Sequence, residues 1–300
     1  NYEIYRKLTM GYGDEIMATA EAREAKKKFP NAKIVIGDGK KTYPSIIYLN
    51  NPNIYQGEIS PTHNDEYIWI MNYMNNRPYI DYTKFNSERI IWDSTYSSIP
   101  GDIYFSKEEN KNIKKIINKA IEIWENNTGK KFKYLVIVDS SVKSAKYTGA
   151  ILKKDNFARL NRDWGFEKWQ QVINSLKDEI TFIQPFKGEV RKLSNVVNIE
   201  CDFRVALAMI NNSDLFIGHH GGLSHATAAL NKPGVIIFGG WISPKITGYK
   251  SHEDLYIEST DFPNGCGSKI KCDHCDECMN QITIDVMLSK IMKFIEKCNP

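Results

Sequence analysis

Apolar residues recur along this chain in two rhythms that alternate with one another. Short apolar runs, typical of buried strands, occupy residues 133–138, 180–183, 214–218 and 235–238, with weaker candidates at 2–8 and 33–37. Apolar residues at helical spacing occupy 14–29, 107–127, 164–176, 203–211, 221–230 and 283–298. Residues 42–105 show little periodicity and are expected to hold loops and short strands. This alternation of strand and helix predicts an α/β protein.

The length of the chain predicts two domains, because 300 residues exceed what one hydrophobic core normally organises. A strand, a glycine turn, a helix and a second strand follow one another within residues 2–37, which is the order of a βαβ unit. The run at 133–138 would open a second series of the same kind. We therefore predict two doubly wound, Rossmann-like domains at 1–131 and 132–300.

The most informative segment is 214–240, where an apolar strand ends at Gly218 and a helix of small residues follows. His219, His220, Gly221 and Gly222 form the turn between them, and His225 lies on the helix. Glycines let a backbone approach a ligand closely, and a helix N-terminus presents unpaired N–H groups to an anion. The segment indicates a phosphate-binding site. The alternative is a tight turn whose histidines are satisfied polar groups.

This segment resembles glycosyltransferase family 9, the heptosyltransferases. The match comprises Ile217–His225, then Ala228–Pro233, then the apolar run Val235–Gly239. His220 stands where the family usually has an aspartate, and Gly221 stands for its hydroxyl residue. The resemblance implies the GT-B fold, in which two domains face each other across a cleft, with the final helix at 283–298 packing back across the first domain.

Two further motifs occur in the order that this resemblance requires. Gly13-Asp14 and Phe29-Pro30 match the start of the family, which implies that Asp14 is the general base for the acceptor hydroxyl. A carboxylate at a helix N-terminus should stay ionised, although Asp14 could instead cap the helix. Arg162 matches a basic residue that contacts the donor phosphates, and an exposed arginine at a helix start is the alternative. Lys143 is a weaker candidate for the same region.

Four cysteines cluster before the last helix, in a loop at 266–278. Cys266, Cys272, Cys275 and Cys278 could surround one structural Zn²⁺ or iron ion, with His274 able to replace one of them. Free or oxidised thiols are the alternative, because spacing alone does not establish ligation.

The charge and the hydropathy exclude several other classes. A net charge of +4 with a pI of about 8.5 is too mild for the dense basic patch of a nucleic-acid binder, so no nucleic-acid partner is expected. It would suit a nucleotide-sugar donor or peripheral contact with the anionic inner face of a membrane. No apolar run approaches the ~20 residues of a membrane span, and residues 1–6 lack the apolar core of a secretory leader. These features predict a cytoplasmic protein.

The resemblance implies an inverting glycosyltransferase that needs no cofactor for catalysis. The expected donor is a nucleotide-diphosphate sugar, by analogy ADP-heptose, and the expected acceptor is a hydroxyl of a glycan or lipid-linked glycan in surface polysaccharide or lipopolysaccharide synthesis. One alternative is a sugar-nucleotide epimerase that uses His219 and His220 as its acid and base. Another is a catalytically inactive nucleotide-binding protein of the same fold, which the histidine at position 220 suggests.

Overall fold

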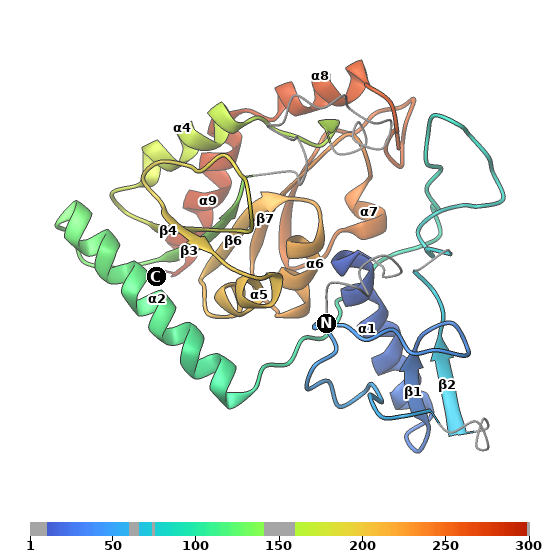
Figure 1. Cartoon of the computed structure of the whole chain (residues 1–300). Helices are drawn as coiled ribbons and strands as arrows, with labels where there is room; N and C mark the ends of the chain where they lie inside the picture. The colour runs from blue at the N-terminus through green and yellow to red at the C-terminus, as the bar shows by residue number, and fades with distance from the viewer. Residues whose placement is uncertain (1–10, 60–65, 74–75, 141–159, 299–300) are drawn as a thin grey trace.

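The computed structural model describes residues 11–59, 66–73, 76–140 and 160–298 of the chain (Figure 1). The strand expected at 2–8 and the candidate Lys143 therefore lie outside the described residues. Within them, strands and helices alternate as the sequence predicts. No helix among these residues combines the length and the apolar character that crossing a membrane requires.

The second half of the chain forms one parallel sheet in the order β5-β4-β3-β6-β7-β8. Its strands are β3 (Leu135–Asp139), β4 (Thr181–Phe186), β5 (Val197–Glu200), β6 (Leu215–His219), β7 (Gly234–Gly239) and β8 (His252–Tyr256). This is the strand order of a dinucleotide-binding sheet, which confirms the Rossmann-like prediction for this half. The order reverses between β3 and β6, so a ligand crevice is expected beyond the carboxyl ends of these two strands.

Helices cover both faces of this sheet, which explains why its strands are apolar runs rather than alternating ones. One face carries α4 (Phe166–Leu176) and α9 (Ile284–Cys298), and the other carries α2 (Lys107–Thr128) and α5 (Phe203–Asn211) (Figure 1). Within β3, Val136 and Val138 point to the first pair of helices, while Leu135 and Ile137 point to the second.

The position of α9 corrects one prediction. The family resemblance implies that this helix packs back across the first domain. In the structure it packs instead against α4 and the six-stranded sheet. The contact is formed by Met287, Ile291 and Ile295 of α9 with Trp169 and Ile173 of α4. An amphipathic pattern identifies the buried face of a helix but not the surface that covers it. In this protein the apolar stripe of α9 covers the part of the sheet face beside α4.

The first half of the chain has a two-stranded sheet among its described residues, and a full doubly wound domain there stays a prediction, because the strand expected at 2–8 lies outside them. Its described residues form β1 (Lys33–Ile36) and β2 (Tyr67–Ile70), which pair in parallel and pack against α1 (Tyr12–Lys28). Helix α2, which precedes the second domain in the sequence, packs on the six-stranded sheet. The core around α1 extends across to Leu207 of α5 and Ala226 of α6 (Gly222–Ala229), so the two halves pack against each other here. Two short helices, α7 (Pro244–Thr247) and α8 (Asp273–Gln281), complete the described elements.

The packing of α9 leads to a stability prediction. Ile291 is fully buried, so Ile291→Ala should lower the free energy of unfolding by about 2–5 kcal/mol through lost burial and a cavity. Val286 on the same helix is 40% exposed, and Val286→Ala should change it by no more than about 0.5 kcal/mol. Chemical denaturation of both variants checks this, and equal losses would contradict the observed orientation of α9.

Candidate active site

The N-terminal ends of α1 and α6 touch each other, which brings together two motifs from opposite halves of the chain. A Cβ atom at Gly13 would lie 3.1 Å from the His225 ring and 3.6 Å from the Cα of Gly222. Tyr12 stacks on Phe203 of α5 with 4.2 Å between ring centroids. The glycines are therefore what allow the two helix ends to approach so closely. Figure 1 shows α1 running beneath α6 and beside β1 and β2.

Asp14 lies in the first turn of α1 and is only 7% exposed. Its Oδ1 accepts a 2.6 Å hydrogen bond from the Tyr79 hydroxyl, and its Oδ2 accepts one of 3.0 Å from Nε of Arg77. The N-cap of the helix is Gly11, and no side chain caps it, so the alternative role of Asp14 as a helix cap finds no support. Sequence analysis did not identify Arg77 or Tyr79, because both lie in a stretch without apolar periodicity.

Two opposing effects act on the Asp14 carboxyl. Burial raises the pKa of Asp14 above its ordinary value, while the Arg77 charge and the hydrogen bonds from Tyr79 and Arg77 lower it. The burial effect is the larger, so the pKa of Asp14 lies above its ordinary value. Without its two partners, the group would hold its proton to a still higher pH.

Three histidines line the turn from β6 to α6, and burial keeps all of them neutral. Nε2 of His219 accepts a 3.0 Å hydrogen bond from the Trp164 backbone N–H, and burial, aided by the Arg162 charge, lowers the pKa of His219 to about 3. Burial also lowers the pKa of His220, whose ring lies 4.5 Å from that of Phe238. These histidines therefore bring no positive charge to the turn.

His225 completes this group from the first turns of α6. Its Nδ1 lies 2.6 Å from the Tyr249 hydroxyl, and burial lowers the pKa of His225 to about 3. Its ring packs edge-on against that of His220, with 5.1 Å between the centroids. His225 thus supports the turn from behind, while its other edge meets Gly13.

The start of α6 has the features of an anion site. By helix geometry, its first N–H groups lack an acceptor within the helix, and the helix dipole adds partial positive charge there. A Cβ atom at Gly221 would meet no atom of the described residues within 4 Å, so these residues leave the backbone at this point open to a ligand. Ser224 Oγ, meanwhile, holds the turn by accepting from the Gly221 N–H at 3.0 Å.

Arg162 supplies the nearby positive charge. Its guanidinium lies over the ring of Trp241, 4.4 Å from the ring centroid. Its charge also lowers the pKa of His219 and of His220, which reflects its closeness to the turn between β6 and α6. The structure thus brings Arg162, all three histidines and both glycines of the predicted donor site into one region, while Lys143 lies outside the described residues.

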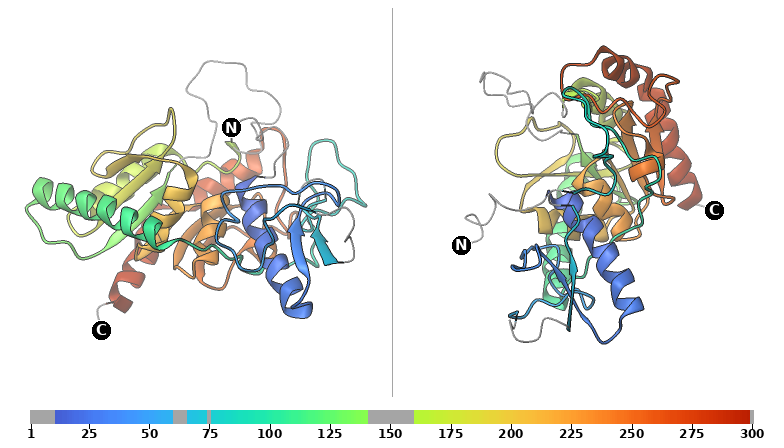
Figure 2. Two further views of the ribbon diagram at one scale, coloured as in Figure 1. Left: turned by 60° about the horizontal axis from the view of Figure 1, so that its bottom comes forward. Right: turned by 90° about the vertical axis from the view of Figure 1, so that its right-hand side faces the viewer.

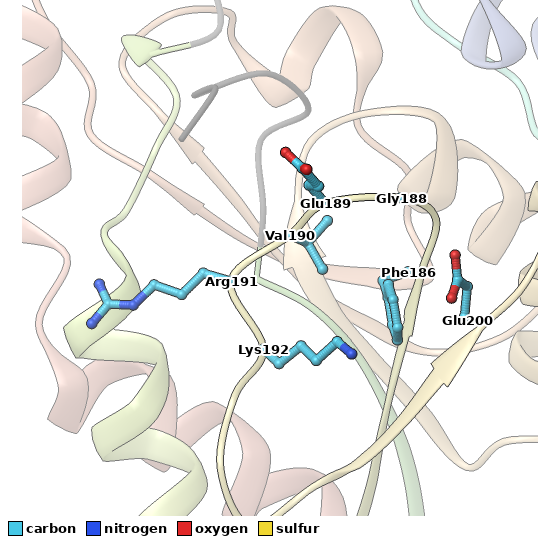
Figure 3. Close-up of a pocket in the computed structure, with 7 residues that line it drawn as sticks. All are labelled: Phe186, Gly188, Glu189, Val190, Arg191, Lys192 and Glu200. Atoms are coloured by element: carbon cyan, nitrogen blue, oxygen red, sulfur yellow. The ribbon is translucent and has the colours of Figure 1, made fainter. Parts of the chain in front are cut away.

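A hollow of about 530 Å³ lies at the carboxyl ends of β4 and β5 (Figure 3). Phe186 and Glu200 are the last residues of these strands. In Figure 3 the Lys192 ammonium is turned toward the Phe186 ring, at 4.4 Å from its centroid, while Arg191 points away toward α4. The hollow opens on the same edge of the sheet as the turn that follows β6.

Three of the four predicted cysteines meet in space. The sulfurs of Cys266, Cys272 and Cys275 all lie within 4.8 Å of one another and are buried. Cys278 lies outside this group, with its Sγ 3.6 Å from Nε2 of His274. Cys275 and Cys278 stand on α8, so the segment is not only the loop that its sequence predicted. Tetrahedral thiolates about 2.3 Å from a metal stand roughly 3.8 Å apart. The Cys266–Cys272 separation of 3.9 Å fits this, whereas the Cys266–Cys275 separation of 3.1 Å is shorter.

Comparison with known proteins finds similarity in structure alone. No known protein-family profile matches the sequence, and no curated protein does. The iron-containing dodecameric glycosyltransferase TibC of enterotoxigenic Escherichia coli matches 97% of this chain and 75% of its own, at 14% identity and a TM-score of 0.56. A family 9 glycosyltransferase of Veillonella parvula matches 84% of each chain, at 13% identity and a TM-score of 0.50.

A shorter match is to the Escherichia coli heptosyltransferase WaaC, solved with ADP. It covers 55% of this chain and 45% of WaaC, at 16% identity and a TM-score of 0.35, so this chain corresponds to less than half of that enzyme. Identities this low establish the fold rather than the activity. The chain has the α/β GT-B-type fold found in glycosyltransferases of family 9.

Proposed function

We propose that the protein is a glycosyltransferase that moves a sugar from a nucleotide-diphosphate sugar to a hydroxyl group, with inversion at the anomeric carbon. The observation that carries this proposal is the meeting of Asp14 with the open start of α6, through the contact of Gly13 with Gly222. Residues 1–131 then contribute the base and the acceptor side, and residues 132–300 bind the donor. The fold shared with TibC and the Veillonella parvula enzyme supports this reaction class.

The donor diphosphate lies at the N-terminus of α6 in this proposal. The backbone N–H groups after Gly221 and the Arg162 guanidinium offset its charge, which increases on the leaving oxygen as the sugar departs. The nucleoside extends into the hollow beyond β4 and β5, where Phe186 offers a ring face and Glu200 a carboxylate for hydroxyl groups. The hollow lies beside the switch point between β3 and β6, beyond which nucleotides bind in parallel sheets of this strand order.

Asp14 takes the proton of the acceptor hydroxyl as that oxygen attacks the anomeric carbon. Each carboxylate oxygen accepts one hydrogen bond from Arg77 or Tyr79 and keeps a second lone pair for the acceptor. The acceptor in this proposal is a glycan or lipid-linked glycan at the inner face of a membrane, and the donor sugar is a heptose carried by ADP, by analogy with the sequence resemblance. The epimerase alternative is weaker, because His219, with a pKa of about 3, does not exchange protons near neutral pH.

The cysteine cluster has a structural role in this proposal. Cys266, Cys272 and Cys275 offer buried soft ligands that suit Zn²⁺ or iron, and the neighbour TibC is described as iron-containing. When bound, such an ion would link Cys266 and Cys272 of the segment before α8 to Cys275 in the first turn of that helix. The transfer reaction would not require it.

Asp14→Asn should lower hydrolysis of the cognate donor by about 10²–10⁴-fold while leaving its affinity unchanged, because the amide keeps the shape but cannot take a proton. ADP-, GDP- and UDP-sugars are screened by thermal shift, and hydrolysis of the stabilising donor is followed by nucleotide release. Glu15→Gln is the matched control, because Glu15 is a buried carboxyl on the same turn that accepts from Ser45 instead. It should keep most of the activity.

Stabilisation by no nucleotide or nucleotide sugar would exclude a transferase. Binding without turnover in the wild-type protein would favour the inactive nucleotide-binding protein, and turnover to a second sugar nucleotide without acceptor would favour the epimerase. Full activity in Asp14→Asn would remove Asp14 from the mechanism.

Elemental analysis of the purified protein should find about one zinc or iron ion per chain. Cys275→Ser should lose the ion, because it removes a buried ligand from the cluster. Cys201→Ser should keep it, since Cys201 lies outside the cluster at the end of β5. Equal metal content in the two variants would contradict ligation by the cluster.

A further inference from the structure

We propose that the loop around Cys266 positions Arg77 and Tyr79 on Asp14, so that the cysteine segment and the candidate base form one connected unit. This inference rests on the proposed function in one respect, namely that Asp14 is the general base of the reaction. Arg77 and Tyr79 are then positioning residues, which act through Asp14 and not on the substrates. Three steps of contact connect the two ends.

The first step is the pair of side chains on Asp14. Arg77 and Tyr79 come from a stretch after β2 that is neither helix nor strand. The side chain of Asp14 is 8% exposed, whereas that of Arg77 is 40% exposed. A half-exposed arginine on irregular backbone keeps one geometry only if its backbone is held elsewhere.

The second step pairs this stretch with the segment that follows it. The Asp93 N–H donates to the Tyr79 carbonyl at 3.0 Å, and the Asp81 N–H donates to the Ile91 carbonyl at 2.9 Å. Between them, Ile80 and Trp92 form an antiparallel bridge. Trp92 is itself fixed, because its indole N–H donates to the Trp241 carbonyl at 3.0 Å.

The third step pairs the same segment with the cysteine loop. The Ile90 N–H donates to the Gly267 carbonyl at 2.8 Å, and the Lys269 N–H donates to the Glu88 carbonyl at 2.7 Å. Gly267 has a φ of 59°, and a Cβ there would lie 2.0 Å from the Ile90 carbonyl oxygen, so only glycine permits the approach. Figure 2 shows the segment near residue 90 reaching toward the loop before α8.

Arg89 closes this contact with its side chain. Its guanidinium donates to the carbonyl of Cys266 at 3.0 Å and lies 4.4 Å from the centroid of the Phe262 ring. These two contacts involve neither a cysteine sulfur nor Asp14, so Arg89 is the position where the connection can be cut with least damage to either end.

The connection has a chemical consequence at Asp14. Arg77 and Tyr79 lower the pKa of Asp14 against the effect of burial, so their displacement raises it. A base with a raised pKa stays protonated to a higher pH, and the acid limb of the rate profile moves upward. The groups around Asp14 are Arg77, Tyr79, Tyr48, Tyr96, the helix neighbour Glu15 and, against Gly13, His225.

The test uses the full chain and two independent readouts, the acid limb of donor hydrolysis and amide hydrogen exchange over residues 77–93. Arg77→Gln should move the acid limb up by roughly one pH unit, and Arg77→Lys should restore part of that shift. Arg89→Met should move it in the same direction by less and should speed exchange over 77–93 several-fold, with donor affinity unchanged.

Lys84→Met is the matched control, because Lys84 lies on the same segment with a 72% exposed side chain, and its ion pair among the described residues is a 3.2 Å contact with Asp81. It should change neither readout, and thermal unfolding shows whether each variant folds. An acid limb and exchange rates in Arg89→Met that equal those of the wild type would overturn the connection. If no donor is hydrolysed at all, the proposed function fails, and the exchange comparison of Arg89→Met with Lys84→Met still decides the connection.

Discussion

The ends of α1 and α6 touch through glycines, and the rest of the candidate site takes its position from that contact. Any side chain at Gly13 would press on the His225 ring, so the approach depends on the absence of one. The described sheet of the first half of the chain has only two strands. Through this contact, the core around α1 packs against α5 and α6 of the second half. It also sets Asp14 beside the start of a helix whose backbone is open to an anion.

The charges around this contact are unevenly distributed. Burial removes the charge from His219, His220 and His225, so the positive field that the described residues give the turn comes from backbone N–H groups and Arg162. Burial raises the pKa of Asp14, and Arg77 and Tyr79 oppose that effect. These two partners therefore let Asp14 ionise at a lower pH than burial alone would allow. In the proposed reaction, the Asp14 carboxylate and the leaving diphosphate are both negative and act from opposite sides of the contact between the two helix ends.

Much of the second half could be predicted from the sequence, because strands buried on both faces are continuous apolar runs. The helix at 203–211 was predicted with the bounds that α5 has. Strands β5 and β8 were not predicted, since they are short and only partly buried. Strand β2 falls within 42–105, where short strands are expected but without bounds. The roles of Arg77 and Tyr79 could not be predicted from the sequence. Their position beside Asp14 depends on two sets of backbone hydrogen bonds between segments far apart in the chain, and no local pattern encodes those. The packing surface of α9 was missed for the same reason.

The most direct test of this account is a crystal structure of the protein soaked with the nucleoside diphosphate that stabilises it best. The account predicts the diphosphate at the start of α6, within hydrogen-bonding distance of the backbone N–H groups after Gly221 and of Arg162, with Asp14 facing it from α1. A nucleotide bound elsewhere, with the turn between β6 and α6 empty, would contradict the central claim that this contact is where donor and base meet.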